Sequence, residues 1–391
     1  MEQIRLSWRG IVFLLVLLVT GSIALFAVMT PLFILTLVSR AILHTKNPLF
    51  RRIYDFYRQA AHTIQWMWMG LVVMLIKNLF HTKILCFGDE STKQNEKKMI
   101  NERALWLSNH RTRIDWMVLW SLALDTGTLG HLKIVLKHTL RMIPVFGWAM
   151  QHFMFIFLRR SWAEDKKQLS FLLPFLGSYE PNSSYLFFPE GSDLSEKMVE
   201  KSNAFAKSKN LEARQYTLHP RTKGFAFIID EVFPHLDAIY DITMMYIDHT
   251  KGERPSELSL ISGRMPKEVY FYIERLPVDS LRSEIGNTKR LSTWIESRFQ
   301  RKETTLKTFY EKAHQLPENA KPLFDEYKAS KSWLILCYWV GIIVFPSILL
   351  VMVEIHIVLM YIMGICVAYI LSTSFFNGAD NFIFHIRQES Q

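Results

Sequence analysis

A histidine and an aspartate five positions apart, His110 and Asp115, are the first candidates for chemistry, within the polar stretch SNHRTRID. On a continuous helix, five steps of about 100° would turn these two side chains away from each other. They can meet only if His110 lies in a loop and Asp115 lies in the first turn of the helix that follows. Asp115 would then hold one imidazole nitrogen while the other accepts a proton, which is the chemistry of a general base.

This pair is the histidine and aspartate part of a catalytic triad without the serine nucleophile. A base of this kind serves an external alcohol that arrives as a substrate. The alternative interpretation is structural, with an aspartate capping a helix beside a loop histidine.

Paired arginines at the end of an apolar run are candidates for binding an anion. Residues 155–158 are strand-like, and Arg159 and Arg160 follow them directly. Two guanidinium groups at the end of a buried strand would form an anion clamp, whereas a solvated strand end explains the same residues without a ligand. Arg221 and Lys223, in the segment HPRTKGF, could add to the same positive site or could belong to a capped helix start.

The segment FPEGS places Glu190, Gly191 and Ser192 after a strand-like run and before a helical one. Gly191 permits close approach of the backbone to a ligand, and a helix start presents free N–H groups to an anion. Because Glu190 cannot itself bind phosphate, we expect it to orient a cation that does. A proline-glycine turn with a serine cap is the structural alternative.

The central part of the chain, about residues 84–318, must position these groups. Short apolar runs alternate there with segments of helical periodicity, which predicts an α/β fold with a mixed central sheet flanked by helices. The expected strands cover residues 104–107, 134–136, 154–158, 185–188, 239–246 and 269–273. The expected helices cover residues 116–124, 166–179, 194–208, 222–232 and 291–314.

Apolar segments flank this central part. Residues 10–39 are uncharged and exceed the roughly 20 residues that cross a bilayer, which favours a retained membrane anchor over a signal peptide. Pro31 allows this helix to be kinked or re-entrant. Residues 60–76 predict an interfacial helix, and residues 333–353 with 355–376 predict a transmembrane hairpin. The predicted domains are an N-terminal anchor with its interfacial helix (1–83), a catalytic domain (84–318) and a C-terminal hairpin with its tail (319–391).

Basic residues set the predicted orientation in the membrane. They cluster after the first apolar run and before the hairpin, so the positive-inside rule places the middle of the chain in the cytosol. The main ones are Arg40, Lys46, Arg51, Arg52, Arg58, Lys328 and Lys331. In this orientation the acceptor sequence at Asn182 stays unglycosylated, because acceptor sites must face the lumen.

Composition narrows the class of protein further. Hydrophobic residues make up 50% of the 391 positions, which excludes a disordered chain, and the net charge of +10 suits a membrane surface or an acidic substrate. We expect no nucleic-acid binding, because neither a recognisable motif nor a contiguous basic face accompanies that charge. Cys86, Cys337 and Cys366 are too few and too scattered for a disulfide framework or a metal cluster, so no metal is expected.

In order and spacing, these segments resemble sequence blocks of the membrane-bound glycerolipid acyltransferases, the 1-acylglycerol-3-phosphate acyltransferase group. Asn109 and His110 with Asp115 resemble the catalytic NHxxxxD block. Residues 157–160 resemble the second block, which assigns the acceptor phosphate to Arg160, and the FPEGS segment resembles the third. The usual Val-Pro block is absent, and the sequence there is similar to the eukaryotic branch of lysocardiolipin and lysophosphatidylinositol acyltransferases.

The resemblance implies acyl transfer from acyl-CoA to the hydroxyl of a lysophospholipid, of phosphatidylinositol, cardiolipin or phosphatidic acid type, in phospholipid synthesis or remodelling. It implies catalysis by His110 and Asp115, and a substrate site of Asn109, Arg159, Arg160, Glu190, Gly191, Ser192, Arg221 and Lys223. No cofactor is expected besides acyl-CoA as co-substrate, and no particular protein partner is implied. The expected location is the endoplasmic reticulum or membranes associated with mitochondria. A CoA-independent phospholipid transacylase and a catalytically silent membrane scaffold are the alternatives.

Overall fold

The computed structural model describes residues 6–43, 45–324, 333–343 and 355–388. The chain forms two compact units, each built from segments that are distant in sequence. The first unit comprises residues 1–13, 73–134 and 162–327, and the second comprises residues 14–72, 135–161 and 328–391.

A mixed sheet forms the centre of the first unit, in the strand order β3-β5-β2-β6-β7-β1-β8. Most neighbours run parallel, whereas β6 with β7 and β1 with β8 run antiparallel. The strands are β1 Lys83–Gly88, β2 Ala104–Ser108, β3 Leu132–Lys137, β5 Ser184–Phe187, β6 Ala238–Ile247, β7 Glu268–Pro277 and β8 Lys321–Pro322. The predicted α/β fold with a mixed sheet is confirmed.

The register of the central strands determines where the chain leaves the sheet. Every residue of β2 is buried, as is typical of a strand that is covered on both faces. Leu107 near the end of β2 pairs with Phe187, the last residue of β5, in parallel orientation. Because parallel strands end at the same edge of a sheet, the loops after β2 and after β5 start side by side. These are the loops that carry the NHxxxxD and FPEGS segments.

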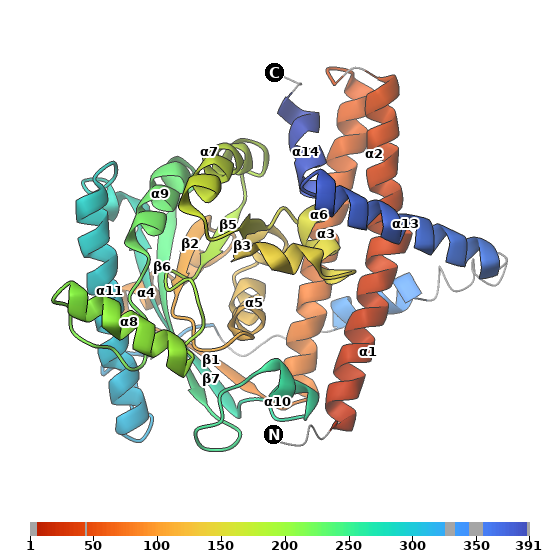
Figure 1. Ribbon diagram of the computed structural model, residues 1–391. Helices are drawn as coiled ribbons and strands as arrows, with labels where there is room; N and C mark the ends of the chain where they lie inside the picture. Colours follow the sequence, from red (N-terminus) through yellow and green to blue (C-terminus); the bar gives the residue numbers. More distant parts are fainter. Residues whose placement is uncertain (1–5, 44, 325–332, 344–354, 389–391) are drawn as a thin grey trace. The chain divides into compact units, whose positions relative to one another are not determined.

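Helices cover the sheet of the first unit. Figure 1 shows α9 and α11 on one side of the strands and α5 on the other. The helix α11 packs on β6 and β7 through an apolar cluster of Met245, Tyr272, Leu306 and Phe309. The main helices are α5 Asp115–Asp125, α7 Trp162–Tyr179, α8 Glu196–Ser208, α9 Thr222–Val232 and α11 Thr288–Glu311. Five helices were expected in this part of the chain, and each is found within a few residues of its predicted bounds.

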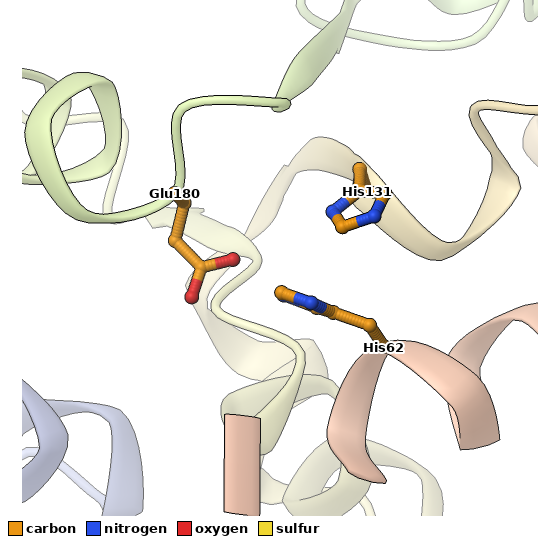
Figure 2. A group of neighbouring side chains, drawn as sticks. All are labelled: His62, His131 and Glu180. Carbon is orange, nitrogen blue, oxygen red and sulfur yellow. The ribbon is translucent and has the colours of Figure 1, made fainter. Parts of the chain in front are cut away.

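A buried ion pair fixes the sheet near the start of β3. The Nζ atom of Lys133 lies 3.3 Å from Oε2 of Glu180, which follows α7, and both side chains are almost fully buried. Figure 2 shows Glu180 with His131, the last residue of the 3-10 turn that precedes β3; His62, also drawn, belongs to α3 in the second unit. A lysine buried at this depth requires such a partner, because an unpaired buried charge is strongly destabilising.

The second unit is mainly helical. The helices α1 Trp8–Ser22 and α2 Thr30–Ile42 are joined without a break by a π-helical segment, Ile23–Met29, which ends just before Pro31. Proline removes a backbone donor, and a π-helical turn is one way to accommodate that loss. The other elements are α3 Pro48–Asn78, α6 Phe146–His152, β4 Ile156–Leu158, α13 Ile355–Phe375 and α14 Ala379–Gln388. The strand β4 pairs with residues 135–137 of β3.

Two described helices are long and apolar enough to cross a membrane, Trp8–Ile42 and Ile355–Phe375. A shorter apolar helix covers Trp333–Ile343, whereas residues 344–353 of the predicted hairpin lie outside the described part of the chain. The hairpin as a whole therefore stays a prediction. The expected interfacial helix begins earlier than predicted, because α3 starts at Pro48, and proline is favoured in the first turn of a helix.

Candidate active site

His110 and Asp115 lie in the places that their spacing requires. His110 is in the loop after β2, and Asp115 is the first residue of α5. The Nδ1 atom of His110 lies 3.0 Å from Oδ2 of Asp115. At the start of α5 the positive end of the helix dipole also favours the negative charge of the carboxylate.

The Asp115 carboxylate is fully buried and surrounded by donors. Its Oδ2 accepts a hydrogen bond from the backbone N–H of Thr112 at 2.9 Å. Its Oδ1 accepts from the hydroxyl groups of Thr112 and Tyr246, each at 2.7 Å. Burial, followed by the nearby Asp115 charge, raises the pKa of Tyr246, so this phenol stays protonated and donates. An acceptor in such surroundings requires His110 to carry its hydrogen on Nδ1, which leaves Nε2 as the proton acceptor.

The His110 loop is held from several directions. The imidazole ring stacks on Phe188 of the FPEGS segment, with ring centroids 4.3 Å apart. The backbone N–H of His110 donates to Oε1 of Glu190 at 2.7 Å, and its carbonyl accepts from the N–H of Leu194 at 2.9 Å. The side chain of His110 keeps 18% of its surface exposed, so a substrate hydroxyl can reach the imidazole.

Glu190 connects two loops through its buried carboxylate. Oε1 accepts from the N–H of His110, and Oε2 accepts from the N–H of Leu218 at 2.8 Å. Burial raises the pKa of Glu190 to about 8, and the two N–H groups oppose this rise because they favour the ionised form. The hydrogen bonds of Glu190 are thus with backbone amides, whereas the sequence predicted that it would orient a cation.

Gly191 and Arg221 lie against each other. Gly191 has a φ of +69°, and a Cβ atom at this position would lie 2.4 Å from Nε of Arg221. The backbone N–H of Arg221 donates to the carbonyl of Pro189 at 2.7 Å. The structure therefore brings together the FPEGS and HPRTKGF segments. The Ser192 hydroxyl lies 3.5 Å from Oδ1 of Asp193, and Lys223 is exposed in the first turn of α9.

Asn109 serves the backbone of the sheet. Its Nδ2 donates to the carbonyl of Met244 at 3.1 Å, and its Oδ1 accepts from the N–H of Met244 at 2.7 Å. The side chain is almost completely buried, with 1% of the residue exposed. These contacts give Asn109 a positioning role, and the substrate contact predicted from the sequence stays a prediction.

The motif also contains an arginine whose role the sequence did not reveal. Arg111 forms a bidentate ion pair with Asp248, at 2.7 and 3.0 Å. Its guanidinium group also lies over the rings of Tyr246 and Tyr310, 5.3 and 5.1 Å from their centroids. Arg111 thus fixes the loop after β2 to the end of β6 and to α11. The sequence holds no local signal for these contacts, because both partner segments are distant along the chain.

A buried lysine contacts the strand that precedes the NHxxxxD segment. The Nζ atom of Lys302 in α11 lies 3.3 Å from the carbonyl of Leu107 and 2.5 Å from that of Ile242. The same atom pairs with Oδ1 of Asp241 at 2.5 Å. Burial lowers the pKa of Lys302, and the Asp241 carboxylate opposes this by favouring the charged amine. Lys302 therefore ties the end of β2 and the middle of β6 to α11.

The paired arginines belong to the second unit. Arg159 and Arg160 follow β4 and are exposed, as a strand end predicts. Arg160 has a φ of +66°, in the left-handed region that few non-glycine residues adopt. Arg159 donates to Oδ1 of Asn377 at 3.2 Å. The anion clamp that the sequence predicts from these two arginines stays a prediction.

Comparison with known proteins identifies the family of this chain. A family model described as Acyltransferase matches residues 84–247, and one described as Acyltransferase C-terminus matches residues 259–339. The first match contains the His110 and Asp115 pair together with the FPEGS and HPRTKGF segments. It therefore covers all of the site that the first unit brings together.

Several relatives are similar over most of the chain. Lysocardiolipin acyltransferase 1 of Mus musculus is 34% identical over 310 residues, which cover 78% of this chain and 74% of that protein. A probable 1-acyl-sn-glycerol-3-phosphate acyltransferase 5 of Arabidopsis thaliana is 33% identical, with 72% of this chain and 70% of that protein covered. Lysophosphatidylinositol acyltransferase 10 of Caenorhabditis elegans is 32% identical, with 62% and 60% covered. This chain belongs to the 1-acylglycerol-3-phosphate acyltransferase family, in the branch of these relatives, and it is an O-acyltransferase.

Proposed function

We propose that this enzyme transfers a fatty acyl group from acyl-CoA to the free hydroxyl of a lysophospholipid, in phospholipid synthesis or remodelling. The observation that carries the proposal is the His110 and Asp115 pair, in which a buried, fully hydrogen-bonded carboxylate orients the imidazole. Among the described residues, no serine or cysteine hydrogen-bonds to the His110 ring. A base without an attached nucleophile suits direct transfer to an alcohol substrate.

In the proposed reaction, Nε2 of His110 accepts the proton of the lysophospholipid hydroxyl. The hydroxyl oxygen attacks the thioester carbonyl, and backbone amides stabilise the negative charge that forms on the carbonyl oxygen. The tetrahedral intermediate then releases CoA, whose sulfur takes the proton back from the imidazolium. Between these two proton transfers, Asp115 accepts the hydrogen bond from Nδ1–H and stabilises the imidazolium. No covalent acyl-enzyme is needed, and no cofactor enters the reaction beyond the acyl donor.

For the acceptor, we propose a lysophospholipid of phosphatidylinositol, cardiolipin or phosphatidic acid type, because the relatives are named for these classes. Arg160, supported by Arg159, would bind the acceptor phosphate. Arg221, beside Gly191, would add positive charge within the first unit. We further propose that the enzyme is integral to the endoplasmic reticulum membrane or its mitochondria-associated regions. The catalytic residues would face the cytosol, where acyl-CoA is available.

Replacing His110 tests the catalytic role. His110→Ala in detergent-purified protein should lower kcat by 10²–10⁴-fold, which is the usual contribution of general-base catalysis. The thermal unfolding temperature, measured on the same preparations, shows whether the variant remains folded. A folded variant that keeps activity within about tenfold of the wild type would show that His110 is not the base.

The donor and acceptor are tested with labelled substrates. Purified enzyme is given labelled acyl-CoA with lysophospholipids of the inositol, glycerol, acid and cardiolipin types, and in parallel labelled phospholipid without acyl-CoA. We expect label to move from acyl-CoA to at least one of the acceptors. Transfer from phospholipid alone would instead identify a CoA-independent transacylase, and the absence of any transfer by folded protein would favour a membrane scaffold.

A further inference from the structure

A turn between α13 and α14 holds a set of contacts that the proposed reaction has not used. We call residues 377–380, Asn-Gly-Ala-Asp, the C-terminal corner. It follows α13, which ends at Phe375, and α14 starts at its third residue. Both family matches end before it, at residues 247 and 339. The corner therefore lies outside the part of the chain that defines the family.

The C-terminal corner holds one buried arginine of the second unit. Arg141, 2% exposed, donates to Oδ1 of Asp380 at 2.5 Å and to the carbonyl of Asn377. The guanidinium group of Arg141 also lies 5.1 Å from the ring centroid of Phe157, in the strand that leads into Arg159. Arg141 thus bridges the corner and β4.

A buried glutamine locks the same turn. Oε1 of Gln151 accepts from the N–H of Ala379 at 2.8 Å, and its Nε2 donates to the hydroxyl of Thr373 and to the carbonyl of Arg141, each at 3.1 Å. Gly378 has a φ of +87°, and a Cβ atom there would lie 2.3 Å from Oε1 of Gln151. Only glycine fits this conformation and this spacing, so the backbone of the corner is held in one conformation against Gln151.

The corner also reaches the paired arginines directly. Nη2 of Arg159 donates to Oδ1 of Asn377 at 3.2 Å. The next residue, Arg160, has the unfavourable φ of +66° described above. A non-glycine residue persists in this conformation only where its surroundings hold it there. Asn377, with a φ of +56°, tolerates the left-handed region because asparagine is one of the residues that adopt it.

We infer that the C-terminal corner positions the arginine turn at residues 159–160 for binding of the acceptor phosphate, with Asn377 as the positioning residue. This inference depends on the proposed role of Arg160. Asn377 accepts a hydrogen bond from Arg159, and Asp380 and the carbonyl of Asn377 accept from Arg141, so these contacts hold the arginine turn against the C-terminal corner. The C-terminal segment would then serve acceptor recognition as well as attachment to the membrane.

A matched pair of variants at Asn377 tests the inference. Asn377→Gly removes the Oδ1 acceptor but keeps the backbone conformation and the carbonyl that binds Arg141, whereas Asn377→Asp keeps an oxygen for Arg159. We expect Asn377→Gly to raise the KM for lysophospholipid about threefold to tenfold, with kcat and the KM for acyl-CoA changed less than about twofold. Asn377→Asp should keep the KM for lysophospholipid near that of the wild type.

These readouts separate positioning from stability, because loss of folded enzyme lowers kcat per milligram without raising one KM selectively. An unchanged lysophospholipid KM in Asn377→Gly, or an equal rise in Asn377→Asp, would overturn the inference. Arg160→Ala is measured beside them. If it raises the lysophospholipid KM and Asn377→Gly does not, only the positioning role fails. If Arg160→Ala has no effect, the proposed phosphate role of Arg160 fails, and a rise confined to Asn377→Gly would transfer that role to Arg159.

Discussion

Two buried carboxylates adjoin His110, and their surroundings differ. Asp115 accepts hydrogen bonds from three protein donors besides the imidazole, two of them hydroxyl groups. Among the described residues, the donors to Glu190 are two backbone N–H groups, and burial raises its pKa to about 8. Asp115 can therefore stabilise an imidazolium during the reaction. Glu190 instead positions the backbone of His110 and thereby its imidazole ring.

The raised pKa of Glu190 makes the stability of the protein depend on pH. Between the ordinary value of a glutamate, about 4.3, and about 8, the folded state binds a proton that the unfolded state releases. The contribution of Glu190 to stability is therefore complete below about pH 4 and is lost as the pH rises through 8, by at most about 1.4 kcal/mol per pH unit. Glu190→Gln, which does not titrate, should gain stability relative to the wild type as the pH rises from about 5 to 8.

This prediction is measured by chemical denaturation of both proteins across that pH range. Asp380, whose pKa burial raises to about 6, titrates in both proteins, so its effect cancels in the difference between them. Stability curves that run parallel from pH 5 to 8 would contradict the assignment of a perturbed pKa to Glu190.

At the scale of elements, the sequence predicted the strands and helices whose formation depends on local patterns. Apolar runs identified β2, β5 and β6, and the spacing of His110 and Asp115 correctly placed one in a loop and the other at a helix start. The strands β1 and β8 were missed: β1 was not among the expected strands although it has six residues, and β8 has only two residues, one of them proline.

The contacts that hold the site could not be predicted, because they join residues far apart in sequence. Tyr246 and Asp115 are separated by 131 positions, and Lys302 and Leu107 by 195. From the sequence alone, Tyr246 looks like an ordinary core residue of a strand. Lys302 looks like a surface lysine of a helix. Only the pairing of β2 with β6 and the packing of α11 bring them to the site.

The contact between the loops at the ends of β5 and before α9 gives a second prediction. Gly191→Ala should destabilise the protein by about 1–2 kcal/mol, because alanine is strained at a φ of +69°. It should also raise the KM for lysophospholipid, since the new methyl group displaces the Arg221 side chain. Thermal unfolding and steady-state kinetics measure the two effects.

A double-mutant cycle with Arg221→Ala separates strain from contact. In the Arg221→Ala background the steric conflict is gone, so Gly191→Ala should still destabilise the protein but should no longer change the KM. Additive changes in KM would show that Gly191 acts on the substrate independently of Arg221.

At the scale of the whole molecule, each unit contributes a different part of the proposed enzyme. The first unit holds the base and its supporting residues on the sheet, whereas the second holds the paired arginines at the end of β4. The second unit also joins four of its helices through buried polar groups. The His152 ring hydrogen-bonds Tyr57 and Tyr369, each at 2.6 Å, and Tyr369 contacts Thr30 at 2.9 Å. Such bonds are favourable between apolar helices, where unpaired polar groups find no water.

The proposed orientation in the membrane gives the last prediction, which concerns Asn182. This residue is exposed in the turn between α7 and β5, so the glycosylation machinery would modify it if the first unit faced the lumen. With the first unit in the cytosol, wild-type protein made in microsomes should show no mobility shift on endoglycosidase treatment.

A glycosylation sequence added before Met1 serves as the matched control. It should be modified if the helix Trp8–Ile42 crosses the membrane once, and unmodified if that helix is re-entrant. A shift in the wild type that is lost in Asn182→Gln would place the base in the lumen, away from cytosolic acyl-CoA, and would overturn the orientation on which the proposed reaction depends.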